Sequence, residues 1–136
     1  MSAPARNWTA ANSWDRPSWT VEELERAKAG RTVTVVLPAL NEQETVAGVI
    51  DTVRPLLGGL VDELVVLDSG STDETVVRAR AAGARVLSRE EAVPGLAPVP
   101  GKGEVLWRSL AATSGDLVAF VDSDLIDPDP AFVPRL

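Results

Sequence analysis

The sequence predicts an α/β fold, a Rossmann-like parallel sheet with flanking helices. Two observations support this prediction. Short apolar runs alternate along the chain with stretches in which apolar residues recur every three or four positions, and these patterns are typical of buried strands and amphipathic helices. Strands that alternate with helices form parallel sheets through crossover connections. Four strands are expected, at residues 33–37, 63–67, 84–87 and 117–121.

Length and composition limit the protein classes to consider. The 136 residues suffice for one domain with a single core, and 45% hydrophobic with 24% charged residues is typical of soluble globular proteins. A net charge of −7 and a pI near 4.5 argue against a nucleic-acid partner. No stretch indicates a membrane span or membrane surface, so a cytoplasmic location is expected. The absence of cysteine and histidine excludes thiol chemistry and the commonest nitrogen ligand for metals.

Residues 1–30 are predicted to form an N-terminal arm that precedes a domain over residues 31–136. Three of the four tryptophans, Trp8, Trp14 and Trp19, lie in this arm. A stacking platform for a base or sugar is one interpretation. We favour packing against the domain, or against a second subunit in a homodimer, because aromatic side chains contribute large buried areas.

The helices are predicted from their first residues. Thr20 is the expected N-cap of a short helix over residues 21–28. A side-chain acceptor followed three residues later by glutamate has the spacing of a capping box, in which the two residues cap each other's backbone. This spacing occurs after each of the first two strands, in Asn41 with Glu44 and in Ser71 with Glu74.

Residues 88–101 interrupt the alternation with a loop rich in proline and glycine. The loop is longer than most connections, and such loops are often functional. A helix over residues 102–113 is expected to follow, with Val105, Leu106 and Leu110 on one side and Trp107 in the core.

An acid pair follows the last predicted strand directly. Asp122 and Asp124 are one residue apart, so they are expected on the same side of a fully buried strand. Open α/β sheets bind ligands at the carboxyl ends of their strands. Two unpaired carboxylates oppose each other's ionisation, and a divalent cation bound to a phosphate would relieve this. A plain acidic loop is the alternative, because the pair alone is a weak signal.

Polar residues also follow the other strands. In a parallel sheet all four strand tips share one edge, and their convergence favours a nucleotide site. Neither a Walker A nor a G-x-G-x-x-G sequence is present, which argues against a P-loop ATPase or a dinucleotide-binding protein. The converging residues are Pro38 to Glu42, Asp68 to Ser71, Lys102, and Asp122 to Asp124.

Several of these motifs resemble the successive signatures of GT-A glycosyltransferases. The matching stretches are Val36-Leu37-Pro38-Ala39-Leu40-Asn41-Glu42, then Val66 to Asp73, then Asp122-Ser123-Asp124. With Pro100 to Glu104, Leu106 to Asp116 and Phe120 to Ile126 added, the chain closely resembles the actinobacterial glucosyl-3-phosphoglycerate synthase family over about residues 31–136. The resemblance implies the N-terminal part of a GT-A fold. It also implies a metal-dependent, retaining transfer of glucose from UDP-glucose to 3-phosphoglycerate in methylglucose lipopolysaccharide synthesis.

The resemblance assigns a role to each matching residue. A uridine would be lined by Pro38, Ala39, Leu40, Asn41 and Glu42, with the Glu42 carboxylate accepting from ribose hydroxyls. Uracil would contact Ser69 and Lys102. The ribose and diphosphate would contact Asp122 and Ser123. Asp124 would bind Mg²⁺ or Mn²⁺, which stabilises charge on the departing UDP.

The family's acceptor site and a histidine metal ligand lie beyond the matching part. We therefore interpret the chain as the donor-binding half of a larger enzyme whose catalytic residues follow residue 136. A GT-A transferase with another acceptor and a non-catalytic nucleotide-binding module remain alternatives. A haloacid-dehalogenase-type phosphatase also carries Asp-x-Asp after an apolar strand, but it needs further groups downstream, and only 12 residues follow Asp124.

Overall fold

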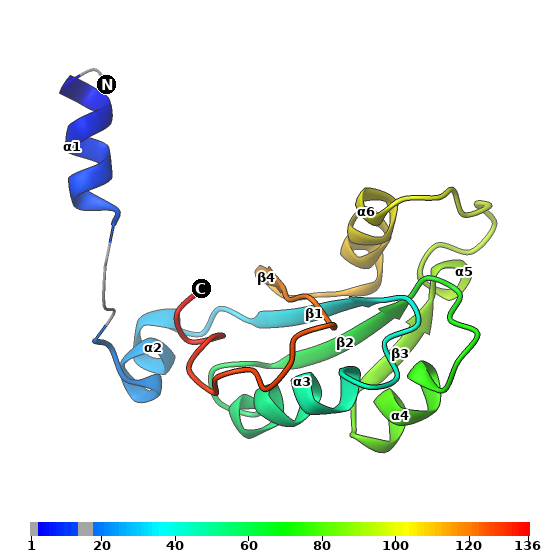
Figure 1. The fold of residues 1–136 in the computed structure, drawn as a ribbon. Coiled ribbons are helices and arrows are strands. Elements are labelled where there is room, and N and C mark those ends of the chain that lie inside the picture. Colours follow the sequence, from blue (N-terminus) through cyan, green and yellow to red (C-terminus); the bar gives the residue numbers. More distant parts are fainter. Residues whose placement is uncertain (1–2, 14–17) are drawn as a thin grey trace.

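A computed structural model describes residues 3–13 and 18–136 of the chain (Figure 1). Its centre is a four-stranded sheet in the order β3-β2-β1-β4, with every neighbouring pair parallel. The predicted parallel α/β sheet is therefore confirmed. The strands are β1 (Val33–Ala39), β2 (Glu63–Asp68), β3 (Arg85–Ser88) and β4 (Leu117–Phe120).

Helices cover both faces of this sheet (Figure 1). One face carries α3 (Val46–Val53), the 3-10 turn η1 (Arg54–Leu56) and α4 (Thr75–Ala81). The other face carries α6 (Lys102–Ala112), and the short α5 (Arg89–Ala92) follows β3. The helices α1 (Ala3–Ala11) and α2 (Val21–Lys28) precede the sheet. No helix in these described ranges is long and apolar enough to cross a membrane.

The main core lies between the sheet and α3. Fully buried residues of α3, among them Val49 and Ile50, share a cluster with Val35 and Leu37 of β1. A smaller cluster brings together Leu67, Ala92 and Val105, from β2, α5 and α6. Because alternate residues of each central strand enter opposite faces, the strands are buried on both sides and hold their tips in place.

The strand β4 differs from the prediction of a fully buried strand. Leu117 is 46% exposed and Phe120 is 39% exposed. Within the described part of the chain β4 pairs with β1 alone, so it is an edge strand with one side uncovered. Val121, directly after it, is buried in the main core and anchors the residues that follow.

The second half of the arm is attached to the domain. Thr20 and Glu23 form a capping box that starts α2, as the N-cap prediction expected. The Trp19 indole N–H donates to the Pro134 carbonyl at 2.7 Å, so this tryptophan packs as predicted. Trp8 is 67% exposed and does not. Trp14 lies outside the described residues, and the arm–domain boundary stays a prediction.

The predicted capping boxes after β1 and β2 are wrong. Thr45 precedes α3 and Glu74 precedes α4, so Asn41 and Ser71 lie ahead of these helices and cap neither. A capping box occurs instead at α5, in the segment expected to be a loop, between the side chains and backbones of Ser88 and Glu91.

The orientation of α6 also differs from the prediction. Its bounds agree with the prediction to within one residue, and Val105 is buried, but Trp107 and Leu110 are 53% and 55% exposed. The residues that α6 buries besides Val105 are Arg108 and Ser109, which are fully covered. The buried side of this helix therefore includes an arginine.

Candidate functional site

The tips of the four strands open into one cavity of about 510 Å³. This volume lies in the range that small-molecule sites usually have. Nine of the ten predicted donor-site residues line it, and Asn41 does not. The complete lining is Pro38, Ala39, Leu40, Glu42, Ser69, Arg89, Pro100, Gly101, Lys102, Val105, Asp122, Ser123 and Asp124.

The two predicted acids lie on the same side of the chain. Val121 and Ser123 are buried, whereas Asp122 and Asp124 are exposed and line the cavity. The backbone turns at Ser123 and Asp124, directly after β4, so both acids face the cavity although the strand itself has ended. The Ser123 hydroxyl donates to the Pro38 carbonyl at 2.7 Å and so joins the tip of β4 to the tip of β1.

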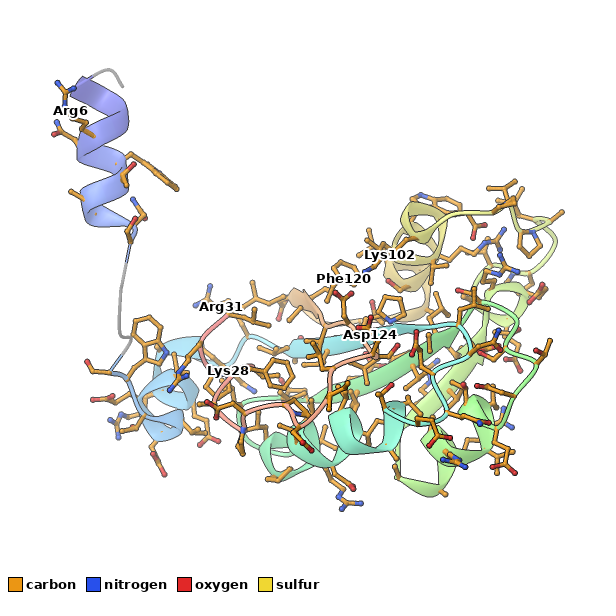
Figure 2. The ribbon with its side chains drawn as sticks, viewed as in Figure 1. Arg6, Lys28, Arg31, Lys102, Phe120 and Asp124 are labelled. Carbon is orange, nitrogen blue, oxygen red and sulfur yellow. The ribbon has the colours of Figure 1, made fainter. Side chains whose placement is uncertain are left out.

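Lys102 supplies a cation to the cavity. Figure 2 shows Lys102 on α6, above the stretch after β4 that carries Asp124. The Lys102 ammonium donates to a carboxylate oxygen of Asp122, and this hydrogen bond raises the pKa of Lys102. An ammonium has three N–H donors, so a charged Lys102 can bind Asp122 and still donate to a ligand carbonyl or phosphate.

One part of the cavity lining comes from two segments that we call the stitched wall: residues 40–45 after β1, and residues 68–75 from the last residue of β2 to the first residue of α4. Asn41 has a φ of +57°, a left-handed conformation that asparagine tolerates. Its amide N–H donates to the Ser71 hydroxyl at 2.9 Å, and its side-chain oxygen accepts from the Thr72 N–H at 2.8 Å. The Glu42 N–H donates to the Thr75 hydroxyl at 2.8 Å.

Further bonds join the same two turns. The Gln43 N–H donates to Asp73, and the Gln43 side chain accepts from the Glu74 N–H at 3.0 Å. Burial opposes ionisation of Asp73, but hydrogen bonds from Thr75 and Gln43 outweigh it and lower the pKa of this carboxyl. The stitched wall thus fixes the backbone at Glu42 through contacts spread over both turns.

A second part of the cavity lining comes from residues 89–101, which we call the pinned wall. Arg89, Pro100 and Gly101 line the cavity from this segment. Pro100 and Gly101 belong to a stretch that resembles the family, but none of the three residues was predicted to contact the donor. Their position after the third strand, at the same sheet edge as the other strand tips, could have identified them as site residues. Arg89 Nη1 donates to the Val99 carbonyl at 3.4 Å, which links the two ends of the wall.

The carboxylates of the cavity fit a cation that arrives with a phosphate. Within the described ranges, no group of three or more histidine, cysteine, aspartate and glutamate side chains could hold a metal by itself. The cavity offers the Asp124 carboxylate and the Asp122 oxygen that Lys102 does not contact. One or two protein carboxylates are what Mg²⁺ takes when phosphate oxygens and water complete its coordination.

The four-stranded parallel sheet with its flanking helices has the GT-A glycosyltransferase fold, which solved structures of 68% identity share at TM-scores of 0.88 and 0.89. Residues 34–136 match the model of glycosyl transferase family 2. The chain belongs to this family. The family assignment replaces the phosphatase alternative.

Within this family, the chain is similar to several glucosyl-3-phosphoglycerate synthases. The chain is 74% identical over 129 residues to glucosyl-3-phosphoglycerate synthase of Mycolicibacterium smegmatis, covering 95% of this chain and 43% of the relative. Identity to the synthase of Petrotoga mobilis is 40% over 118 residues, covering 83% and 36%. A crystal structure of the Mycobacterium tuberculosis synthase with Mn²⁺, UDP-glucose and phosphoglyceric acid has a TM-score of 0.89 and 68% identity, covering 91% of this chain and 44% of that chain. The chain therefore spans about two fifths of the length of these relatives.

Proposed function

We propose that this chain is the donor-binding half of a metal-dependent, retaining glucosyltransferase that transfers glucose from UDP-glucose to 3-phosphoglycerate. The observation that carries the proposal is the single cavity at the strand tips, which gathers the acid pair, Lys102, Ser69 and Glu42. Relatives at up to 74% identity are glucosyl-3-phosphoglycerate synthases. A related crystal structure holds UDP-glucose, Mn²⁺ and phosphoglyceric acid together, which supports the same substrates for this chain.

The cavity's chemistry supports a uridine between the two walls. Uracil presents carbonyl oxygens and a ring N–H, which the Lys102 ammonium and the Ser69 hydroxyl can meet. The Glu42 carboxylate can accept from ribose hydroxyls, with Pro38 to Leu40 beneath the nucleoside. Asn41 would act indirectly, because its side chain joins the two turns of the stitched wall. Asp122 can accept from the ribose through the oxygen that Lys102 leaves free.

Asp124 is the proposed metal ligand. A bound Mg²⁺ or Mn²⁺ would act as a Lewis acid on the diphosphate of the leaving UDP. Through the metal, Asp124 would hold the diphosphate of the donor at a fixed position relative to the uridine. Ser123 keeps the tips of β4 and β1 together. Crystal structures of the Mycobacterium tuberculosis relative contain UDP with Mg²⁺ and with Mn²⁺, which supports either ion.

We further propose that the acceptor-binding and catalytic groups lie outside residues 1–136, because the relatives are more than twice as long. Residues 1–136 alone are then expected to bind UDP with metal weakly and to transfer no glucose. The cytoplasmic location and the homodimer stay predictions from the sequence.

Titration calorimetry with UDP and with UDP-glucose tests the proposal. With Mn²⁺ present, the chain should bind both, and Asp124→Ala should weaken binding by about tenfold or more, because a charged phosphate–metal contact is lost. Asp129→Ala, an exposed acid after β4 that does not line the cavity, is the matched control. Equal affinity of Asp124→Ala and the wild type with Mn²⁺ would show that the metal assignment is wrong.

A further inference from the structure

Arg108 is the only fully buried arginine among the described residues, and all its side-chain N–H groups are paired. Its side chain is 0% exposed. Nε donates to the Glu104 carboxylate, one turn earlier on α6. Nη1 donates to the carbonyls of Arg89 and Val93 at 2.9 and 3.2 Å. Nη2 donates to those of Leu96 and Ala97 at 3.0 and 3.1 Å. A guanidinium has five N–H donors, and each has an acceptor here.

All four carbonyls belong to the pinned wall. Arg108 therefore attaches the wall at four points to α6, the helix whose first residue is Lys102. Glu104 extends the attachment, because its carboxylate also accepts from the Val99 N–H at 3.4 Å. The Val99 carbonyl accepts from Arg89. Arg108 and Glu104 thus hold the segment whose residues Arg89, Pro100 and Gly101 face the cavity.

We propose that Arg108 is a positioning residue for nucleotide binding, which sets the pinned wall and Lys102 at the distance from the stitched wall that a nucleotide requires. Arg108 does not line the cavity, so it acts through the backbone carbonyls that it binds. Burial of a charged group is tolerated only when it is paired and hydrogen-bonded, and Glu104 supplies the opposite charge. Lysine has three donors on a single nitrogen and cannot reproduce this planar arrangement.

This inference rests on the proposed function. Two readouts distinguish a failure of the inference from a failure of the proposed function. The first is the affinity for UDP with Mn²⁺. The second is the rate of thermolysin cleavage within residues 93–101, which needs no nucleotide. Arg108→Met keeps an apolar side chain of similar length without the donors. Val53→Ala is the control, because Val53 is fully buried on α3, on the opposite face of the sheet.

Arg108→Met should bind UDP about tenfold more weakly or worse, because displaced binding groups lose affinity steeply, and its wall should be cleaved faster. Arg108→Lys should not restore binding. Val53→Ala should lower the unfolding temperature yet keep both wild-type affinity and slow cleavage. Wild-type affinity in Arg108→Met, or equal weakening in Val53→Ala, would reduce Arg108 to a structural role and overturn the inference.

If the wild type fails to bind UDP, the proposed function is wrong, and cleavage alone decides whether Arg108 holds the wall. In that case the role of Arg108 in nucleotide binding is overturned together with the proposed function. Faster cleavage restricted to Arg108→Met would support only the attachment of the pinned wall by Arg108, and unchanged cleavage would refute that attachment too. Added guanidinium ion that slows cleavage of Arg108→Ala would strengthen that support, because it replaces the missing group.

Discussion

The two walls of the cavity are held in different ways. In the stitched wall, Asn41, Glu42 and Gln43 exchange separate hydrogen bonds with the facing turn, and each bond is a neutral or charge-assisted side-chain contact to a backbone N–H. In the pinned wall, one guanidinium binds four carbonyls. An attachment shared among several side chains should tolerate the loss of one member, whereas the pinned wall should loosen when Arg108, which makes four of its contacts to α6, is lost.

The largest expected difference between the walls is in stability. Arg108→Met leaves the Glu104 carboxylate without its charged partner. It also removes the guanidinium from four carbonyls, of which, within the described part of the chain, only that of Arg89 keeps another hydrogen bond, from the Val93 N–H, so the free energy of unfolding should fall by about 3–5 kcal/mol. Adding Glu104→Leu should recover part of this loss, because no unpaired buried charge remains. Urea unfolding of the two single variants and the double variant measures the coupling. If the losses of unfolding free energy in the two single variants simply added in the double variant, Arg108 and Glu104 would not be an energetically coupled pair.

Acid should loosen the pinned wall through Glu104. Burial opposes ionisation of this carboxyl, but hydrogen bonds from Arg108 and Val99 outweigh it and lower its pKa below the ordinary 4.5. The unfolded chain therefore takes up the proton first, and stability present above pH 4.5 is lost as pH falls through the lowered pKa.

The urea midpoint of the wild type should thus fall more steeply than that of Glu104→Gln between neutral pH and about pH 3. All other acids are common to both proteins, so the difference isolates this group. Parallel slopes for the two proteins would show that Glu104 is not held as a carboxylate by the wall.

The smallest effects are expected in the stitched wall. Ser71→Ala removes one acceptor, that of the Asn41 N–H, and should cost about 0.5–1.5 kcal/mol of unfolding free energy. UDP affinity should change much less than in Arg108→Met, since the neighbouring bonds at Glu42 and Gln43 remain. Thr52→Ala, whose hydroxyl donates to the Gly48 carbonyl within α3, is the control. A loss of affinity as large as that of Arg108→Met would remove the distinction between the walls.

This contrast also explains which features the sequence could predict. The strands follow from local apolar runs, and a parallel sheet brings their tips together by geometry. The sequence could therefore predict that the acid pair, Lys102 and Ser69 lie at one site. Asn41 and Ser71 each precede a glutamate by three residues, which predicts a capping box. The local sequence is the same whether the side chain caps the following helix or bonds to a turn about thirty positions away, as it does here.

The pinned wall could not be predicted for a related reason. Local hydrophobicity places Trp107 inside and Arg108 outside, and the structure has the reverse. Arg108 is buried because a loop more than ten positions earlier supplies acceptors for its donors. The edge position of β4 is likewise a property of the sheet order, which its apolar run does not encode.

Amide NMR spectra of the chain, recorded during a titration with UDP and Mg²⁺, test the central claim most directly. We expect the perturbed signals to gather at the strand tips, in residues 39–42, 69–71, 99–105 and 121–124, on both walls. Residues 21–28 of α2, at the far end of the sheet (Figure 1), should not shift. Saturable shifts confined to α2 or to the far end of the sheet, or no shifts at all, would contradict a nucleotide site at the strand tips.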